Sequence, residues 1–153
     1  MARYNVVHEG DPVLRRISRP IKEVNSNIVK LMNNMAETMY YNHGVGLAAP
    51  QVGINKRVIV VDVGERLIKL ANPEIIKTHG IQNGPEGCLS IPGLYGNVKR
   101  SSYVKIRALN ENNEEVTISA KDFEARALQH EIDHLDGILF TDKATELERE
   151  NRQ

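Results

Sequence analysis

Residues 129–134 read Gln-His-Glu-Ile-Asp-His, a His-Glu-x-x-His pattern whose two imidazoles could hold one metal ion. On a helix, His130 and His134 are four residues apart and therefore project from the same face. Glu131 then lies beside the ion, where its carboxylate can take a proton from a water molecule or return one. This spacing predicts metal-dependent hydrolysis.

The single cysteine of the chain, Cys88, is the candidate for a third ligand. Two histidines leave a tetrahedral ion short of a protein ligand, and a thiolate with two imidazoles leaves the fourth position open to water, as in catalytic sites. Two other interpretations of Cys88 stay open. A lone cysteine is commonly a small buried apolar residue, and a thiolate beside a histidine can act as a nucleophile.

A third segment of interest, residues 44–51, reads Gly-Val-Gly-Leu-Ala-Ala-Pro-Gln. Its small residues would let the backbone approach a ligand closely, although composition alone favours an ordinary tight loop after a helix. Gln51 at its end could donate an amide hydrogen bond to a developing oxyanion.

Two long helices are predicted to position these residues. The first runs from about Ser26 to Asn42, is capped by Asn25 or Ser26 and stops at Gly44. Its apolar residues recur every three or four positions and predict one buried face: Ile28, Leu31, Met32, Met35 and Met39.

The second helix is predicted from about Lys121 to Asp136, with a cap at Ser119 or Asp122 and an end at Gly137. It contains the histidine pair. A short helical turn is also predicted after Asp11-Pro12, since proline suits the first helical position.

The β-branched run Val58–Val63 predicts a buried strand. Shorter strands are predicted at 67–71, 74–78, 98–100, 103–109 and 115–119, with Asn112-Asn113 as a hairpin turn between the last two. The charged residues 144–153 predict a small exposed helix or a frayed end. We expect a single α+β domain spanning residues 1–153, with antiparallel strands packed around a central metal-binding helix.

Composition and charge exclude several classes of function. The chain has 153 residues with 20 basic and 20 acidic side chains, so its net charge is zero. No basic field is available to attract nucleic acid or a membrane surface. A single cysteine cannot form an internal disulfide, and no apolar run approaches the roughly 18 residues of a membrane span. We therefore expect a cytoplasmic protein.

Three motifs of the chain resemble those of the peptide deformylases, in that family's order and at its approximate spacing. They are Gly-x-Gly-Leu-Ala-Ala-Pro-Gln at 44–51, Glu-Gly-Cys-Leu-Ser at 86–90 and Gln-His-Glu-x-x-His at 129–134. The resemblance implies a compact bacterial-type enzyme that removes the formyl group from N-formylmethionyl peptides, the nascent chains near the ribosome, and releases formate.

The resemblance also implies roles for individual residues. Cys88, His130 and His134 would bind one Fe(2+) per chain, with Zn(2+), Ni(2+) or Co(2+) as possible substitutes. Glu131 would be the general base and acid, while Gln51 and the Leu89 backbone N–H would stabilise the oxyanion. Substrate backbone would pair along Gly44, Val45 and Gly46, and Val45, Leu89, Phe123 and Ala127 are candidates for the methionine pocket.

Two further positions follow from the resemblance. Asp133 could orient the site through a basic partner, for which Arg100 is suggested, although an ordinary surface acid is an open alternative. Tyr95 departs from members that carry a basic residue near the substrate groove, which bears on peptide preference downstream of methionine. His8, His43 and His79 show no ligand spacing.

Two rival functions remain at this point. A zinc endopeptidase shares the His-Glu-x-x-His helix but draws its third ligand from a downstream residue, and no histidine follows His134. A metal-stabilised binding module would keep the ligands without using Glu131. The position of Cys88 upstream of the helix favours the deformylase.

Overall fold

The computed structural model describes residues 3–150, which form helices and strands in the α+β arrangement that the sequence predicts. In chain order the elements are η1 (Pro12–Arg15), α1 (Ser26–Tyr41), β1 (Gly46–Ala48), η2 (Ala49–Val52), β2 (Val58–Val61), β3 (Ile68–His79), β4 (Gln82–Cys88), β5 (Ile91–Arg100), β6 (Tyr103–Leu109), β7 (Glu115–Lys121), α2 (Asp122–Leu135), η3 (Phe140–Asp142) and β8 (Thr145–Arg149).

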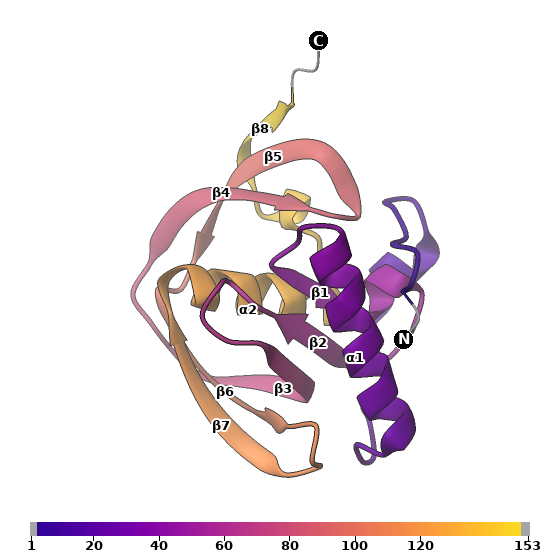
Figure 1. Cartoon of the computed structure of the whole chain (residues 1–153). Helices are drawn as coiled ribbons and strands as arrows, with labels where there is room; N and C mark the ends of the chain where they lie inside the picture. Colours follow the sequence, from indigo (N-terminus) through magenta and orange to yellow (C-terminus); the bar gives the residue numbers. More distant parts are fainter. Residues whose placement is uncertain (1–2, 151–153) are drawn as a thin grey trace.

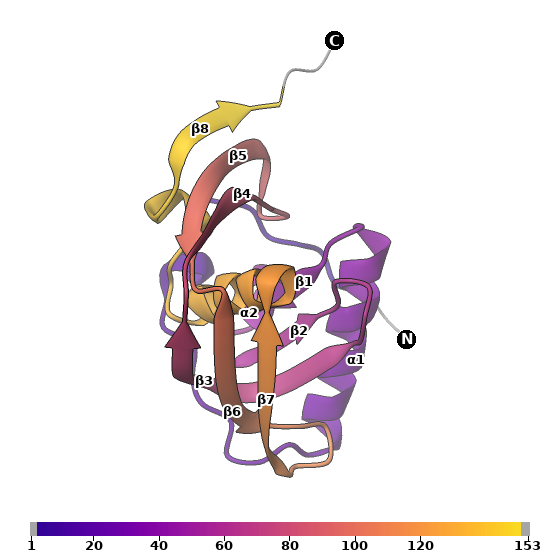
Figure 2. The ribbon, with the colours of Figure 1, turned by 90° about the vertical axis from the view of Figure 1, so that its left-hand side faces the viewer.

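The strands form two sheets, and α2 lies between them (Figures 1 and 2). One sheet has the strand order β1-β2-β3-β6-β7 and the other the order β4-β5-β8, with antiparallel pairing throughout. The first helix covers the opposite side of β1 and β2. The helix that carries the histidine pair is therefore central, as predicted.

The position of β2 in the fold explains why its residues are all apolar and do not alternate with polar ones. Its four residues Val58–Val61 are all inaccessible to solvent. Ile59 and Val61 face the core beneath α2, whereas Val58 and Val60 face the core beneath α1. A strand covered on both faces has no solvent side on which to place polar residues.

The start of α1 agrees with its sequence signals. The Asn25 side chain accepts a hydrogen bond from the Ile28 amide at 3.1 Å, and so satisfies one of the free donors at the helix start. Met32, Met35 and Met39 are fully buried, as expected of core residues. The end of α1 differs from prediction, because the left-handed residue after the helix is His43, with φ 57°, and not Gly44.

The boundaries of α2 are close to those expected, but its predicted caps are wrong. Lys121 occupies the N-cap position and makes no side-chain capping bond, while Asp122 lies in the first turn. Ser119 is a residue of β7. The helix begins directly at the end of this strand, and the Asp122 amide donates to the Ser102 carbonyl at 2.8 Å instead of to a capping side chain. Gly137 follows the helix with φ 73°, as a helix stop requires.

Several strand predictions need correction. Segments 67–71 and 74–78 form one strand, β3, interrupted by irregular register near Ala71–Glu74. The predicted strand 98–100 is the end of a longer hairpin, β4–β5, and Gly46–Ala48 is a strand where a loop was expected. Residues 145–149 form β8 rather than a helix, while 151–153 lie outside the described residues. Within residues 3–150, no helix is both long and apolar enough to cross a membrane.

Candidate metal centre

Three predicted ligands converge from two separate elements. Cys88 ends β4, and His130 and His134 lie one turn apart on α2. One ligand atom from each residue can be chosen so that all three lie within 4.8 Å of one another. The Cys88 Sγ and His134 Nε2 atoms are 3.3 Å apart, which matches the roughly 3.3–3.8 Å between ligand atoms around a tetrahedral ion.

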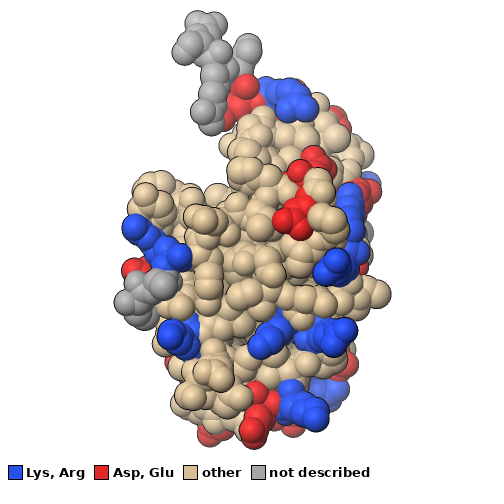
Figure 3. All heavy atoms as spheres, turned by 90° about the vertical axis from the view of Figure 1, so that its right-hand side faces the viewer, with Lys and Arg blue, Asp and Glu red and all other residues tan. Residues whose placement is uncertain are grey.

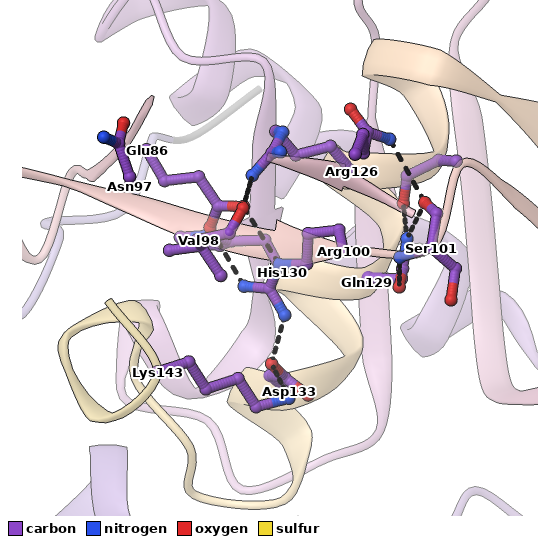
Figure 4. A network of polar contacts seen from close by, with 12 residues as sticks. Glu86, Asn97, Val98, Arg100, Ser101, Arg126, Gln129, His130, Asp133 and Lys143 are labelled. Atoms are coloured by element: carbon purple, nitrogen blue, oxygen red, sulfur yellow. Dashed lines mark hydrogen bonds and ion pairs between the residues drawn. The ribbon is translucent and has the colours of Figure 1, made fainter. Parts of the chain in front are cut away.

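A carboxylate that is not a predicted ligand fixes the orientation of His130. Its Nδ1 atom lies 2.8 Å from Glu86 Oε1 (Figure 4). Since an ionised carboxylate only accepts hydrogen bonds, Nδ1–H is the donor and Nε2 is left for a metal. Burial alone would raise the pKa of Glu86, but hydrogen bonds from Arg100 and His130 outweigh it and hold that pKa well below its usual range.

Glu131 is buried beside the ligands and is only 4% exposed. Its Oε1 atom has no hydrogen-bond partner among residues 3–150. In the protein without metal, burial raises the pKa of Glu131 to about 7, although the neighbouring positive charge of His130 opposes the shift. An unpartnered buried carboxylate of this kind can take up and release a proton near neutral pH.

The two histidines differ in their electrostatic environment when no metal is bound. Burial alone would lower the pKa of His130, but the charge of Glu131 and contacts with Cys88 and Glu86 raise it to about 10. Burial lowers the pKa of His134 well below its ordinary value. A divalent cation favours the neutral form of both rings, so the donor set and the orphaned Glu131 oxygen fit a bound metal.

The side chain of Gln51 is fixed with its amide nitrogen toward the centre. Its Oε1 accepts a hydrogen bond from the Ala48 amide at 2.9 Å, which decides which end of the amide points inward. Its Nε2 lies 3.5 Å from Cys88 Sγ and 3.3 Å from Ser90 Oγ. Gln51 thus presents N–H donors next to a predicted metal ligand.

A cavity of about 370 Å³ opens over this centre. Figure 3 shows the molecule hollowed between its upper part, which bears the three-stranded sheet, and the body below, with mainly uncharged residues around the hollow. Residues of α2 on one face line the cavity: Phe123, Arg126, Ala127, His130 and Glu131. Their spacing of three and four residues is that of a single helical stripe.

The structure places the other predicted site residues around the same cavity. Those that line it are Gly44, Val45, Gly46, Gln51, Cys88, Leu89, Tyr95, Phe123 and Ala127. Asp133 does not line it, but Arg100 Nη1 donates to Asp133 Oδ2 at 2.6 Å, so the suggested pair is present.

Two residues around the centre were missed from the sequence, Glu86 and Arg126, which contact each other. His43, which was set aside because it shows no ligand spacing, also lines the cavity. Glu86 precedes Cys88 by two residues within a recognised motif, which was an available signal. Nothing in the pattern around His43 or Arg126 distinguishes either from a surface residue.

Asp62, the residue after β2, is bonded both to the end of α1 and to the segment before β1, and the first of these contacts joins two groups that titrate. The Tyr40 hydroxyl donates to Asp62 Oδ2 at 2.6 Å, and the Asp62 amide donates to the Val45 carbonyl at 2.8 Å. The hydrogen bond to Asp62 raises the pKa of Tyr40 to about 12 and correspondingly lowers the pKa of Asp62.

Replacing Tyr40 by phenylalanine is expected to lower the free energy of unfolding by about 0.5–1 kcal/mol at neutral pH, a modest effect because Tyr40 is half exposed. The Asp62 contribution is present above the ordinary pKa of aspartate and is lost as the pH falls through its lowered pKa. The Tyr40 contribution is complete below the ordinary tyrosine pKa of about 10 and is lost as the pH rises through about 12. Urea denaturation of both proteins across this range measures the difference, and a difference that persists undiminished in strong acid would contradict it.

A helix-borne histidine pair that converges with a cysteine, beside a buried glutamate that lines a cavity, places the protein among the metal-dependent hydrolases. Comparison with known proteins narrows this class. The family model described as polypeptide deformylase matches residues 3–150. The chain therefore belongs to the polypeptide deformylase family, which is a family of enzymes.

Individual relatives agree with this assignment over nearly the whole chain. A peptide deformylase of Carboxydothermus hydrogenoformans is 57% identical over 152 residues, which cover 99% of this chain and all of that protein. The crystal structure of peptide deformylase from Thermotoga maritima superimposes with a TM-score of 0.92 at 40% identity, covering 95% of this chain and 99% of the other. A peptide deformylase from Synechococcus elongatus, solved in complex with actinonin, gives a TM-score of 0.91 at 39% identity over 95% and 80% of the two chains.

Proposed function

We propose that this chain hydrolyses the formyl amide of N-formylmethionyl peptides, producing formate and a peptide with a free amino terminus. The observation that carries the proposal is the position of Glu131, a buried carboxylate with one unpartnered oxygen, beside the converging ligand atoms of Cys88, His130 and His134. Family membership supports the choice of reaction.

The three ligands would hold one divalent cation per chain, and Fe(2+) is our proposed physiological ion, with Zn(2+), Ni(2+) or Co(2+) able to replace it. When bound, the cation supplies Lewis acidity that polarises the formyl carbonyl and makes a water molecule more acidic. The Glu86 contact to His130 Nδ1 keeps the ring oriented so that Nε2 can reach the cation.

Residues of the protein would transfer the proton and stabilise the negative charge that forms during hydrolysis. Glu131 takes a proton from the attacking water and returns it to the amine nitrogen as the C–N bond of the formamide breaks. The Gln51 amide and the Leu89 backbone N–H donate hydrogen bonds to the carbonyl oxygen as it gains negative charge. The position of Gln51 Nε2 near Cys88 supports this role.

We propose that the peptide binds along β1 as an added strand. β1 is the terminal strand of its sheet, with β2 on one side only, and Gly44, Val45 and Gly46 line the cavity. The apolar residues Val45, Leu89, Phe123 and Ala127 would receive the methionine side chain. Nascent chains in the cytoplasm, near the ribosome, are the proposed substrates, and residues 1–153 the single catalytic domain that acts on them.

The deciding experiment is a formate-release assay on protein purified anaerobically and loaded with Fe(2+). A formyl-Met peptide is compared with its acetyl-Met equivalent, and metal content is measured in the same samples. We expect release of formate and little release of acetate. An intact, iron-loaded protein that releases no formate overturns the proposed reaction, and equal turnover of the acetyl peptide overturns the selectivity for formyl.

A further inference from the structure

We infer that Arg126 is a positioning residue for the metal centre, which acts by holding the Glu86 carboxylate that in turn orients His130. The inference rests on the proposed function only in assigning His130 as a metal ligand. Arg126 and His130 lie one turn apart on α2, whereas Glu86 comes from β4 in the other sheet. Figure 4 shows the three side chains meeting between these elements.

The guanidinium of Arg126 joins Glu86 to the neighbouring strand. Its Nη1 atom lies 2.5 Å from Glu86 Oε2 and 2.9 Å from the Val98 carbonyl oxygen of β5. Arg126 is only 5% exposed, and Glu86 only 7%. A charge-assisted hydrogen bond in such a dry environment restricts the carboxylate more than one at the surface.

Arg126 completes the set of hydrogen bonds to Glu86. A carboxylate has about four acceptor positions, and Glu86 fills them with two donors on each oxygen. Its Oε2 accepts from Arg100 Nε and Arg126 Nη1, and its Oε1 from Arg100 Nη2 and His130 Nδ1. Without Arg126, the bonds on one oxygen are incomplete, and the carboxylate gains freedom to turn away from His130.

The second arginine cannot fully replace this contact, because it is also bound elsewhere. Arg100 Nη1 donates to Asp133 at 2.6 Å, and Lys143 Nζ lies 3.0 Å from the same Asp133 oxygen. Arg100 is therefore held between two carboxylates on opposite sides. Arg126 makes its one ion pair, among those identified within residues 3–150, with Glu86.

Stability alone does not account for a buried arginine at this position. Its Nη2 atom is buried without a hydrogen-bond partner among residues 3–150, which leaves part of the desolvation cost uncompensated. Apolar residues of similar volume often replace buried ion pairs with no loss of stability. Orientation of Glu86, and through it of the metal ligand, is the effect that an apolar residue could not supply.

Replacing Arg126 by a neutral residue has two opposite expected effects on metal affinity, one from its charge and one from its contact with Glu86. Loss of a positive charge near a cation would strengthen metal binding, whereas loss of orientation would weaken it. Glu86 lies in direct contact with Arg126 and balances its charge, so we expect orientation to dominate. Loss of such supporting contacts typically weakens metal affinity by 10–100-fold.

The test compares Arg126→Met with Arg66→Met as the matched control. Arg66 also bonds a buried carboxylate on α2, Glu124, at 2.8 Å, but contacts neither Glu86 nor a ligand. The Zn(2+) dissociation constant is measured by competition with a chelator. We expect an increase of about tenfold for Arg126→Met, a value close to wild type for Arg66→Met, and a displaced visible absorption band when Co(2+) is bound to Arg126→Met.

A folded Arg126→Met protein that binds Zn(2+) as tightly as wild type, or more tightly, overturns the inference. Arg126→Gln, which keeps a polar side chain, gives the decisive measurement if the methionine variant does not fold, with the same expected direction. The outcome is independent of the proposed reaction. If the wild-type protein binds Zn(2+) but releases no formate, the proposed deformylation is refuted and the role of Arg126 is not affected. If the wild-type protein is active but Arg126→Met and Arg126→Gln bind Zn(2+) as tightly as it does, the role of Arg126 is refuted and the proposed reaction is not affected.

Discussion

Glu131→Gln is expected to lower kcat for formate release by about 10³-fold while the protein keeps its fold and its metal. Positioned general acids and bases contribute roughly 10²–10⁴ to rate, and Glu131 is proposed to act twice, first on water and then on the leaving amine. Glutamine has nearly the same shape but cannot accept the proton. The proposed ligands Cys88, His130 and His134 are unchanged, so metal content should stay near one ion per chain.

This expectation is checked by steady-state kinetics on a formyl-Met peptide, with metal analysis and circular dichroism on the same preparations. Glu124→Gln provides the control, because Glu124 lies on the same helix and is similarly buried but pairs with Arg66, away from the cavity. That variant should retain activity close to wild type. A Glu131→Gln protein with a tenth or more of wild-type turnover would show that another group carries the proton.

The parts of the site that the sequence could predict depend on short-range patterns. His130 and His134 share a helix face by periodicity alone, and the helix that contains them has strong apolar spacing. As the only cysteine, Cys88 was already a candidate third ligand, but two other interpretations stayed open, and no spacing relates residue 51 or residue 88 to residue 130. Their association came from three motifs recognised together, and the structure places them around one cavity.

The parts that could not be predicted depend on contacts between distant segments. Glu86 and Arg126 are 40 positions apart and interact because the hairpin β4–β5 packs beside α2. No local pattern reports such a pair. The hairpin itself was largely missed, since its residues 82–97 are rich in glycine and polar side chains and gain their strand conformation from pairing.

The C-terminal segment shows the same limitation. Residues 145–149 are all exposed and charged enough to suggest a frayed end, yet they pair with β5. Leu147 packs closely enough on Gly96 that a β-carbon there would lie 2.7 Å from its Cδ2 atom. Pairing with β5 therefore gives this segment a strand conformation that its own sequence does not favour.

The short strand β1 lies directly against Glu131, the proposed general base. Gly46 pairs with Val61 of β2, which fixes its backbone, and its α-carbon faces Glu131 on α2. A β-carbon at position 46 would lie 2.5 Å from Glu131 Oε2 and 2.9 Å from its Cγ. Because β1 is held by its pairing with β2, the Glu131 side chain would have to move.

Gly46→Ala is therefore expected to reduce kcat by about 100-fold, the size of effect that follows from a displacement of about 1 Å at a catalytic group. Metal content should be unchanged, since the three atoms nearest the new methyl group all belong to Glu131 and none to a proposed ligand. Gly44→Ala is the matched variant, because the closest atom to its β-carbon would be the terminal Cδ1 of Leu89, at 2.9 Å, and this side chain can rotate away. We expect a loss of less than about tenfold there.

The double variant Gly46→Ala/Glu131→Gln separates displacement of Glu131 from a general disturbance of β1. If the alanine acts by moving the Glu131 carboxylate, it should lower kcat only slightly in a protein whose carboxylate has already been replaced by an amide. The two effects on kcat would then be far from additive. Additive losses of kcat/KM in the double variant would show instead that the methyl group obstructs the peptide along β1, and Gly46→Ala alone should then raise KM with little change in kcat.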